Sequence, residues 1–217
     1  IIKHLPMPLY KTISHDVDTQ IFIWKITESE EELRSGVVLK EKHQVRLDGM
    51  LSEQHRKGFL SVRKLLQVAG YEDNDLTYDT NGKPHLADGK NISITHSYEF
   101  SAIIISSKNV GIDLEMNREK IVKIAHKFID SEFDFIKKEE RYIEQLSVIW
   151  GAKEALYKMC NSRSLSFKQD MHIQPFSLNQ ETGKALVACK ELNFECQFNF
   201  YFESFENYTL VYALEHE

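Results

Sequence analysis

Proline and glycine are scarce in this sequence, which has only four prolines and nine glycines among its 217 residues. No stretch of low complexity occurs either. Long flexible linkers are usually rich in these residues and in serine, so the scarcity favours ordered elements joined by short turns. An apolar fraction of 42% and a charged fraction of 28% are ordinary for a chain that buries a core. The composition argues against the fibrous and intrinsically disordered classes.

Cysteine is also rare, and long apolar runs are missing. Cys160, Cys189 and Cys196 are an odd number without C-x-x-C spacing, which argues against a disulfide framework or a cysteine zinc site. We expect free thiols in a reducing compartment. No apolar run has the length of a signal peptide or of a membrane-spanning helix. The sequence therefore predicts a cytoplasmic protein with no membrane partner.

An excess of basic residues is absent as well. The 27 lysines and arginines are outnumbered by 33 acidic residues, which gives a net charge of −6. Nucleic-acid binders need a basic surface to neutralise phosphates, so we expect no nucleic-acid partner. A local basic site for a small phosphorylated ligand remains open.

The apolar pattern of the first half predicts both strands and helix. Residues 51–69 have helical spacing, with Phe59, Val62, Leu66 and Val68 recurring on one side, and Gly70 is expected to end the helix. Strands are expected at residues 20–26, 92–96 and 101–105, the last two as a hairpin.

The second half repeats this combination of elements. A strand begins at Val110, helical spacing runs from Arg118 to Met159, and strands are expected at 171–178, 184–190, 195–202 and 208–214. We therefore predict an α+β protein of two similar halves, 1–109 and 110–217, each with a helix region packed on an antiparallel sheet.

Two acidic side chains lie close together in the strand that begins at Val110. In the segment Val110-Gly111-Ile112-Asp113-Leu114-Glu115, Asp113 and Glu115 project from the same face because they are two residues apart. Such a pair is part of a hard-metal site, since Mg²⁺ takes one or two carboxylates and completes its shell with water and phosphate. Taken alone, the pair is more often a solvated strand end. Gly111 permits another backbone or a ligand to approach closely.

A second cluster lies on the predicted helix, in Trp150-Gly151-Ala152-Lys153-Glu154-Ala155-Leu156-Tyr157-Lys158. Glu154 and Lys158 are one turn apart and share a face. By itself this spacing indicates an exposed ion pair worth about 0.3–0.5 kcal/mol. Trp150 and Tyr157, on the flanking turns, are predicted to serve packing.

Together the two clusters are much more specific. A G-I-D-x-E strand followed by W-x-x-K-E-A-x-x-K resembles the signature of the 4'-phosphopantetheinyl transferase superfamily. The resemblance extends to Thr95-His96-Ser97, which is similar to the family's S-H-S turn, and to Gly82-Lys83-Pro84, which is similar to its G-K-P motif. The length resembles the Sfp-like type, in which two halves are fused and the enzyme is a monomer.

The resemblance implies roles for individual residues. Asp113, Glu115 and Glu154 match the acids that hold Mg²⁺ against the pyrophosphate of coenzyme A, the substrate. Glu154 is the candidate base and Lys158 the residue near the leaving phosphate. Five residues match, or lie near, the family's contacts to the adenosine end of coenzyme A: Lys83, Thr95, His96, Arg63 and, as a second choice, Arg56. Threonine at position 95 departs from the family's usual serine, but its hydroxyl offers the same hydrogen bond.

The implied reaction moves the phosphopantetheine arm of coenzyme A onto a serine of an apo carrier protein. Carrier proteins are acidic, so docking to this acidic chain requires a local basic face, for which Arg118, Lys120, Lys123 and Lys127 have helical spacing. A merely solvated face is the alternative for these residues. Two alternatives to the function itself remain: a Mg²⁺-dependent phosphohydrolase, and a non-catalytic module that binds carrier protein or coenzyme A.

Overall fold

The computed structural model describes residues 9–161, 164–189 and 193–215. The chain divides into two compact units, Ile1–Ser107 and Lys108–Glu217, which we call the first and the second unit. Each unit combines an antiparallel sheet with helices, so the predicted α+β class is confirmed. Among the described residues, no helix has both the length and the apolar character needed to cross a membrane.

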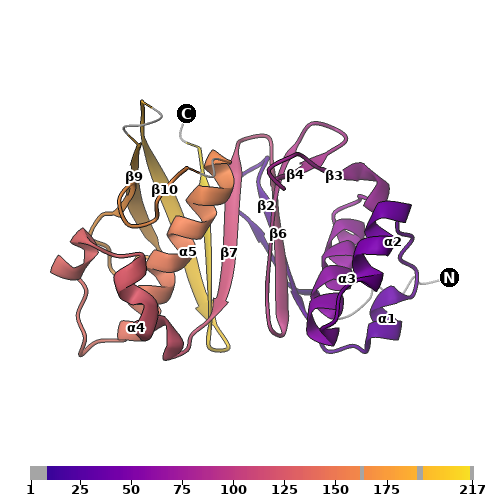
Figure 1. Ribbon diagram of the computed structural model, residues 1–217, viewed down its shortest axis with the longest axis horizontal. Helices are drawn as coiled ribbons and strands as arrows, with labels where there is room; N and C mark the ends of the chain where they lie inside the picture. Colours follow the sequence, from indigo (N-terminus) through magenta and orange to yellow (C-terminus); the bar gives the residue numbers. More distant parts are fainter. Residues whose placement is uncertain (1–8, 162–163, 190–192, 216–217) are drawn as a thin grey trace. The chain divides into compact units, whose positions relative to one another are not determined.

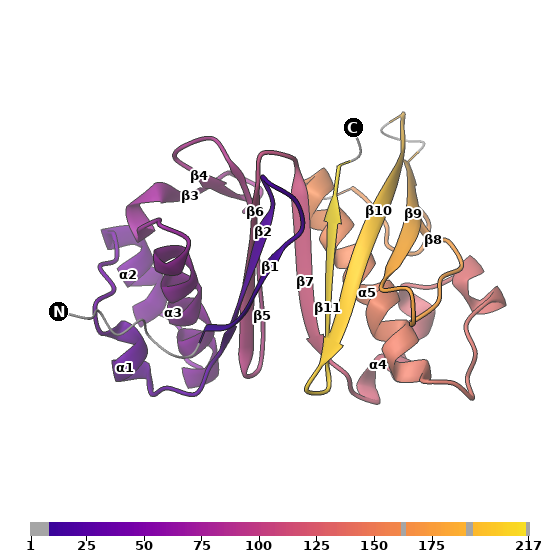
Figure 2. The same ribbon diagram turned by 180° about the vertical axis from the view of Figure 1, so that it is seen from behind.

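The first unit contains a six-stranded antiparallel sheet in the order β1-β2-β6-β5-β4-β3. Its strands are β1 (Leu9–Ser14), β2 (Gln20–Lys25), β3 (Leu76–Tyr78), β4 (Pro84–Leu86), β5 (Asn91–Ser97) and β6 (Phe100–Ser106). Strands β5 and β6 form the predicted hairpin. Figures 1 and 2 show the helices of this unit gathered on one side of the sheet.

The first unit has a hydrophobic core between its sheet and its helices. Helix α3 (Glu53–Val68) supplies most of the helical residues of this core. It begins at Ser52, whose side chain accepts a hydrogen bond from the His55 amide, and Gly70 follows it with a φ of +88°. Glycine adopts this left-handed conformation at little cost, which is why the helix ends there as predicted. Three shorter helical elements accompany it: α1 (Glu30–Arg34), α2 (Glu41–Asp48) and the 3-10 turn η1 (Asp73–Asp75).

The second unit contains a five-stranded antiparallel sheet in the order β7-β11-β10-β9-β8. Its strands are β7 (Val110–Met116), β8 (Met171–Ile173), β9 (Thr182–Cys189), β10 (Phe194–Phe205) and β11 (Tyr208–Leu214). Helix α5 (Tyr142–Cys160) lies across this sheet in Figure 1. Short elements precede it: α4 (Lys120–Ile124) and the 3-10 turns η2 (Ala125–Lys127) and η3 (Ser131–Asp134).

Two glycines allow α5 to approach the sheet closely. A Cβ atom on Gly111 of β7 would lie 1.9 Å from the carbonyl oxygen of Ala155, and one on Gly151 of α5 would lie 2.6 Å from a methyl carbon of Val211. Neither position tolerates a side chain without movement of its neighbours. The expectation that Gly111 lets another backbone come close is confirmed, and that backbone belongs to α5.

Some predicted boundaries are wrong. The helical region 118–159 is interrupted after Asp134, and α5 begins only at Tyr142. The strand predicted for 171–178 ends at Ile173. The Gln174 amide still donates to the Lys184 carbonyl of β9, but Pro175 follows and has no amide that could continue the pairing. The predicted end of the next strand, Lys190, lies outside the described residues. Strands β1, β3 and β4 and helices α1 and α2 were not predicted, since each is too short or too polar to show a clear apolar period.

Candidate functional site

The acids of β7 face helix α5. Asp113 is 5% exposed, and a Cβ built on Gly151 of α5 would lie 3.8 Å from its Oδ2. Glu115, two residues further along the strand, projects from the same face and is half-buried. Strand β11 pairs with β7 throughout this stretch and fixes the strand's orientation, with Asp113 opposite Val211. The pair is therefore turned toward the helix that carries the second cluster.

Helix α5 contributes Glu154 and Lys158. The Lys158 ammonium donates hydrogen bonds to Asp113 Oδ1 at 2.9 Å and to the Ile112 carbonyl oxygen at 2.7 Å. This lysine therefore pairs with the strand rather than making the exposed helical pair that the spacing alone indicates. The structure brings Asp113, Glu115, Glu154 and Lys158 together within the second unit.

The environment of Glu154 is unusual for a carboxylic acid. Burial, followed by the negative charge of Asp113, raises its pKa to about 7; Lys158 opposes the shift, and Glu115 adds to it. Two carboxylates near a third disfavour the ionised form of that third group. A proton or a cation bound at this point would relieve the repulsion.

The donor set fits Mg²⁺. Among the described residues, no group of three or more histidine, cysteine, aspartate or glutamate side chains is already arranged as a metal site. Mg²⁺ does not require such a cage, because water and substrate phosphates complete its octahedron around one or two carboxylates. Asp113, Glu115 and Glu154 offer only oxygen ligands, which is the donor type that this ion prefers. The repulsion that raises the pKa of Glu154 also favours a cation there.

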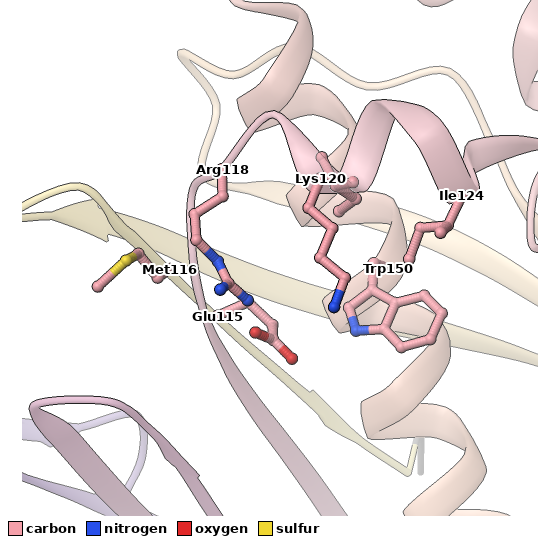
Figure 3. Close-up of a pocket in the computed structure, with 7 residues that line it drawn as sticks. Glu115, Met116, Arg118, Lys120, Ile124 and Trp150 are labelled. Atoms are coloured by element: carbon pink, nitrogen blue, oxygen red, sulfur yellow. The ribbon is translucent and has the colours of Figure 1, made fainter.

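A pocket of about 140 Å³ begins beside Glu115. Its lining comes from the end of β7, the segment that includes α4, and one residue of α5. Figure 3 shows Arg118 beside Glu115 at one side of the pocket, and Lys120 directed toward the Trp150 indole at the other. The pocket therefore combines a carboxylate, two cations and an aromatic wall. Lys120 belongs to the predicted basic face, whose other lysines, Lys123 and Lys127, are exposed.

In the first unit, His96 packs against the start of α3. A Cβ on Gly58 would lie 3.2 Å from the His96 ring, and the ring of His55 lies 6.3 Å from it between centroids. The neighbouring Thr95 is buried on β5. Lys83 ends a tight turn in which its backbone amide donates to Asp79 Oδ1 at 2.9 Å.

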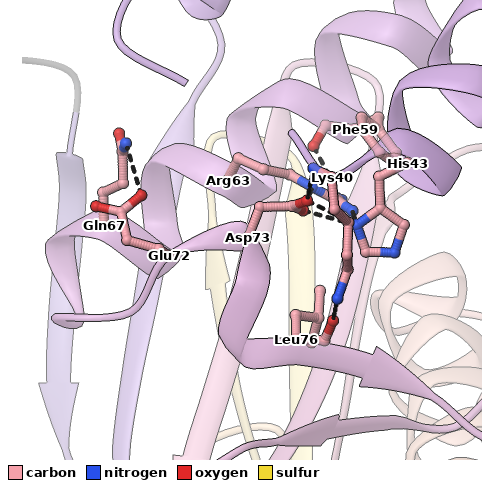
Figure 4. Close-up of polar contacts among 8 residues, drawn as sticks. All are labelled: Lys40, His43, Phe59, Arg63, Gln67, Glu72, Asp73 and Leu76. Carbon is pink, nitrogen blue, oxygen red and sulfur yellow. Dashed lines mark hydrogen bonds and ion pairs between the residues drawn. The ribbon is translucent and has the colours of Figure 1, made fainter. Parts of the chain in front are cut away.

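The two candidate arginines of α3 have very different surroundings. Arg63 is 3% exposed, its Nε donates to Asp73 Oδ1 at 3.0 Å, and its guanidinium lies 3.5 Å from the centroid of the Phe59 ring. Figure 4 shows it inside a network in which His43 and the Lys40 amide also bond Asp73. Arg56 is partly exposed and pairs with Glu30 at 2.8 Å. The prediction that Arg63 contacts a phosphate stays a prediction. Because Arg63 is buried in an ion pair, Arg56 is the better candidate for this contact.

Known proteins with related sequences lead to the same family. The model of the 4'-phosphopantetheinyl transferase superfamily matches residues 109–213, which include β7, α5 and all but the last residue of the sheet of the second unit. This segment of the chain is therefore similar to members of this superfamily. A curated relative, 4'-phosphopantetheinyl transferase gsp of Aneurinibacillus migulanus, is 27% identical over 159 residues, which cover 69% of this chain and 63% of the relative. The chain thus matches less than two thirds of that relative's length.

A buried ion pair in the segment that matches the superfamily model was not predicted from the sequence. Lys153 and Glu132 are both 0% exposed, and Lys153 Nζ lies 2.6 Å from Glu132 Oε1. Burial alone would raise the pKa of Glu132, but Lys153 and the amides of Asp130 and Ile173 outweigh it, so the pKa is lowered. A signal was available, because Lys153 is three residues after Trp150 and four before Tyr157, both of which were predicted to pack.

The packing role predicted for those aromatic residues is confirmed. The Trp150 ring lies 5.0 Å from that of Phe128 and 5.5 Å from that of Phe167 between centroids, and the Tyr157 ring lies 5.4 Å from that of Phe167. Trp150 also lines the pocket beside Glu115, so it connects the core of the unit with the candidate site.

Proposed function

We propose that this chain transfers the 4'-phosphopantetheine group of coenzyme A to a serine of an apo carrier protein, with Mg²⁺ as cofactor. The observation that carries the proposal is the grouping of three acids and a lysine on β7 and α5, in the segment that matches the superfamily. Asp113, Glu115 and Glu154 would hold the metal. When bound, Mg²⁺ would offset the negative charge of the coenzyme A pyrophosphate.

In the proposed reaction the serine oxygen attacks the β-phosphorus of coenzyme A. A new bond forms between serine and phosphorus, and the bond from this phosphorus to the bridging oxygen breaks, which releases adenosine 3',5'-bisphosphate. Glu154 takes the serine proton, directly or through water. Lys158 stabilises the negative charge on the leaving phosphate.

The first unit is proposed to contact the phosphates of coenzyme A. His96 and Lys83 are the candidate donors, Thr95 supplies a hydroxyl group, and Arg56 or Arg63 reads the 3'-phosphate. A charge-assisted hydrogen bond to phosphate contributes about 1.5–3 kcal/mol, or roughly ten- to a hundredfold in affinity. Arg56 is the better candidate of the two arginines, because a phosphate at Arg63 would have to displace Asp73 from a buried pair.

The carrier protein is proposed to dock on the basic face that follows β7. Lys120, Lys123 and Lys127 are exposed there, and Lys120 also lines the pocket beside Glu115. A positive face near the reacting groups would attract an acidic partner despite the net negative charge of this chain. We further propose that the enzyme acts as a monomer in the cytoplasm.

Incubation with a panel of apo carrier proteins tests the function directly. The protein, coenzyme A and Mg²⁺ are mixed with each carrier, and mass spectrometry should show a gain of one phosphopantetheine group on a carrier serine. Glu154→Gln should prevent this gain. Breakdown of coenzyme A at the same rate without carrier would instead indicate a phosphohydrolase. Binding of coenzyme A or carrier with no chemical change of either would indicate a non-catalytic module.

A further inference from the structure

Lys153 is a lysine enclosed in the core of the second unit. All three of its ammonium protons have an acceptor: Glu132 Oε1 at 2.6 Å, the Phe128 carbonyl at 2.6 Å and the Phe167 carbonyl at 3.0 Å. A buried charge is tolerated only when it is paired and hydrogen-bonded in this way. The lysine is adjacent in sequence to Glu154, but its side chain contacts other segments than the side chain of Glu154 does.

Glu132 extends the network to two further segments. Its Oε2 accepts the amide of Asp130 at 2.9 Å, and its Oε1 accepts the amide of Ile173 in β8 at 3.0 Å. The pair therefore ties the middle of α5 to the 3-10 turn η3, to the loop that contains Phe167 and to the edge strand of the sheet. Apart from α5 and β8, these segments have little regular secondary structure to hold them.

Phe128 and Phe167, whose carbonyl groups accept hydrogen bonds from Lys153, also pack against Trp150. Phe128 and Phe167 each give Lys153 a backbone carbonyl and place a ring against the Trp150 indole, at 5.0 and 5.5 Å between centroids. Trp150 is in turn a wall of the pocket that begins at Glu115. A continuous chain of contacts thus runs from the buried pair to the candidate site.

We propose that the Glu132–Lys153 pair is a positioning device, which fixes the turn of α5 that carries Glu154 and holds Trp150 as the wall of the pocket. The inference rests on the proposed transfer reaction. Both residues are completely buried, so neither touches substrate, and they act through Glu154 and Trp150. A displacement of about 1 Å of a reacting group can cost roughly a hundredfold in rate.

A structural role and a positioning role predict different behaviour when both charges are removed. Replacing a whole buried ion pair by apolar side chains is often neutral for stability, whereas removing one partner is strongly destabilising. The double variant Lys153→Met/Glu132→Leu should therefore regain the part of the thermal stability that Lys153→Met loses through its unpaired Glu132 charge. It should not restore the hydrogen bonds to the Phe128 and Phe167 carbonyls, because methionine has no donor.

The test compares these variants in three measurements: the thermal unfolding midpoint, kcat and KM for transfer, and the fluorescence of Trp150. The sequence has two tryptophans, so Trp24→Phe leaves Trp150 as the single reporter. We expect kcat to fall about 10- to 100-fold in both the single and the double variant, with a smaller change in the KM for coenzyme A. The emission of Trp150 should shift to longer wavelength in both. Arg141→Met, which breaks an exposed pair with Glu144 at the start of the same helix, is the matched control and should change none of the three.

Recovery of both stability and kcat in the double variant would overturn the proposal and leave the pair a purely structural role. If the double variant does not fold, Glu132→Gln replaces it, since it keeps the shape of the side chain and removes the charge. Unchanged kcat and unchanged Trp150 emission in that variant would equally refute the positioning role. If the wild-type protein transfers nothing, the proposed function fails, while the emission of Trp150 still shows whether the pair positions this wall.

Discussion

The two arginines of α3 offer a sharp test of which residue meets the 3'-phosphate of coenzyme A. The side chains of Arg63 and Asp73 are 3% and 1% exposed, while those of Arg56 and Glu30 are 26% and 27% exposed. Arg63→Ala would leave Asp73 buried without its arginine partner. Arg56→Ala would break a pair that water already reaches.

The expected magnitudes differ accordingly. Breaking a buried pair by removing one partner costs about 3–5 kcal/mol, or about 6–20 °C in Tm for a chain of this size. Breaking a partly exposed pair costs about 0.2–1 kcal/mol. We therefore expect Arg63→Ala to lower the Tm markedly and Arg56→Ala to leave it nearly unchanged. In transfer assays, Arg56→Ala should raise the KM for coenzyme A roughly ten- to a hundredfold.

Dephospho-coenzyme A, which lacks the 3'-phosphate, is the control substrate. Wild type and Arg56→Ala should use it about equally well, because the hydrogen bond that the substitution removes requires a 3'-phosphate. The opposite assignment would hold if Arg63→Ala kept the wild-type Tm and no longer discriminated between the two substrates. In that case the ion pair with Asp73 opens when coenzyme A binds, and Arg63 is the reader of the 3'-phosphate.

Three further predictions follow from the second unit. Asp113→Asn and Glu154→Gln should each abolish Mg²⁺-dependent transfer while circular dichroism shows an intact fold; near-normal activity at any Mg²⁺ concentration would disprove the metal assignment. Replacing Lys120 and Lys123 by glutamate should raise the KM for carrier protein and leave the KM for coenzyme A unchanged. The increase in KM should become smaller as salt is added, because exposed charges are screened over a Debye length of about 8 Å at physiological ionic strength. Gly111→Ala should destabilise the protein by about 1–3 kcal/mol or more in urea unfolding, because its Cβ would lie 1.9 Å from the Ala155 carbonyl oxygen; wild-type stability would mean that α5 moves away at no cost.

The fold was predictable where the apolar period is strong. Helix α3 and the hairpin β5–β6 follow the expected residues closely, because each buries a regular set of apolar side chains. The prediction failed between Phe135 and Tyr142, where apolar and charged residues continue without a proline or glycine that would mark a break. There the chain is held by tertiary contacts, such as the side-chain amide of Gln145 with the Lys137 carbonyl, rather than by local propensity.

The candidate site was predictable only in part, for a similar reason. Spacing alone placed Asp113 and Glu115 on one face of a strand and Glu154 with Lys158 on one face of a helix. It could not show that Lys158 reaches across to Asp113, because that hydrogen bond joins residues 45 positions apart. It also could not tell the buried Arg63 from the partly exposed Arg56, since Asp73, which makes the difference, belongs to a turn that the sequence did not reveal.

Glu132 and Glu154 show how neighbours decide what a buried carboxylate does. Burial by itself raises the pKa of both. In Glu132 the charge of Lys153 and two backbone amides reverse the effect and lower the pKa, whereas in Glu154 the nearby Asp113 and Glu115 add to it and raise the pKa to about 7. Successive helical residues point about 100° apart, so Lys153 meets the core while Glu154 faces β7. The lysine therefore stabilises the ionised form of Glu132 on one side of α5, and the glutamate next to it stays able to bind a proton or a cation on the other.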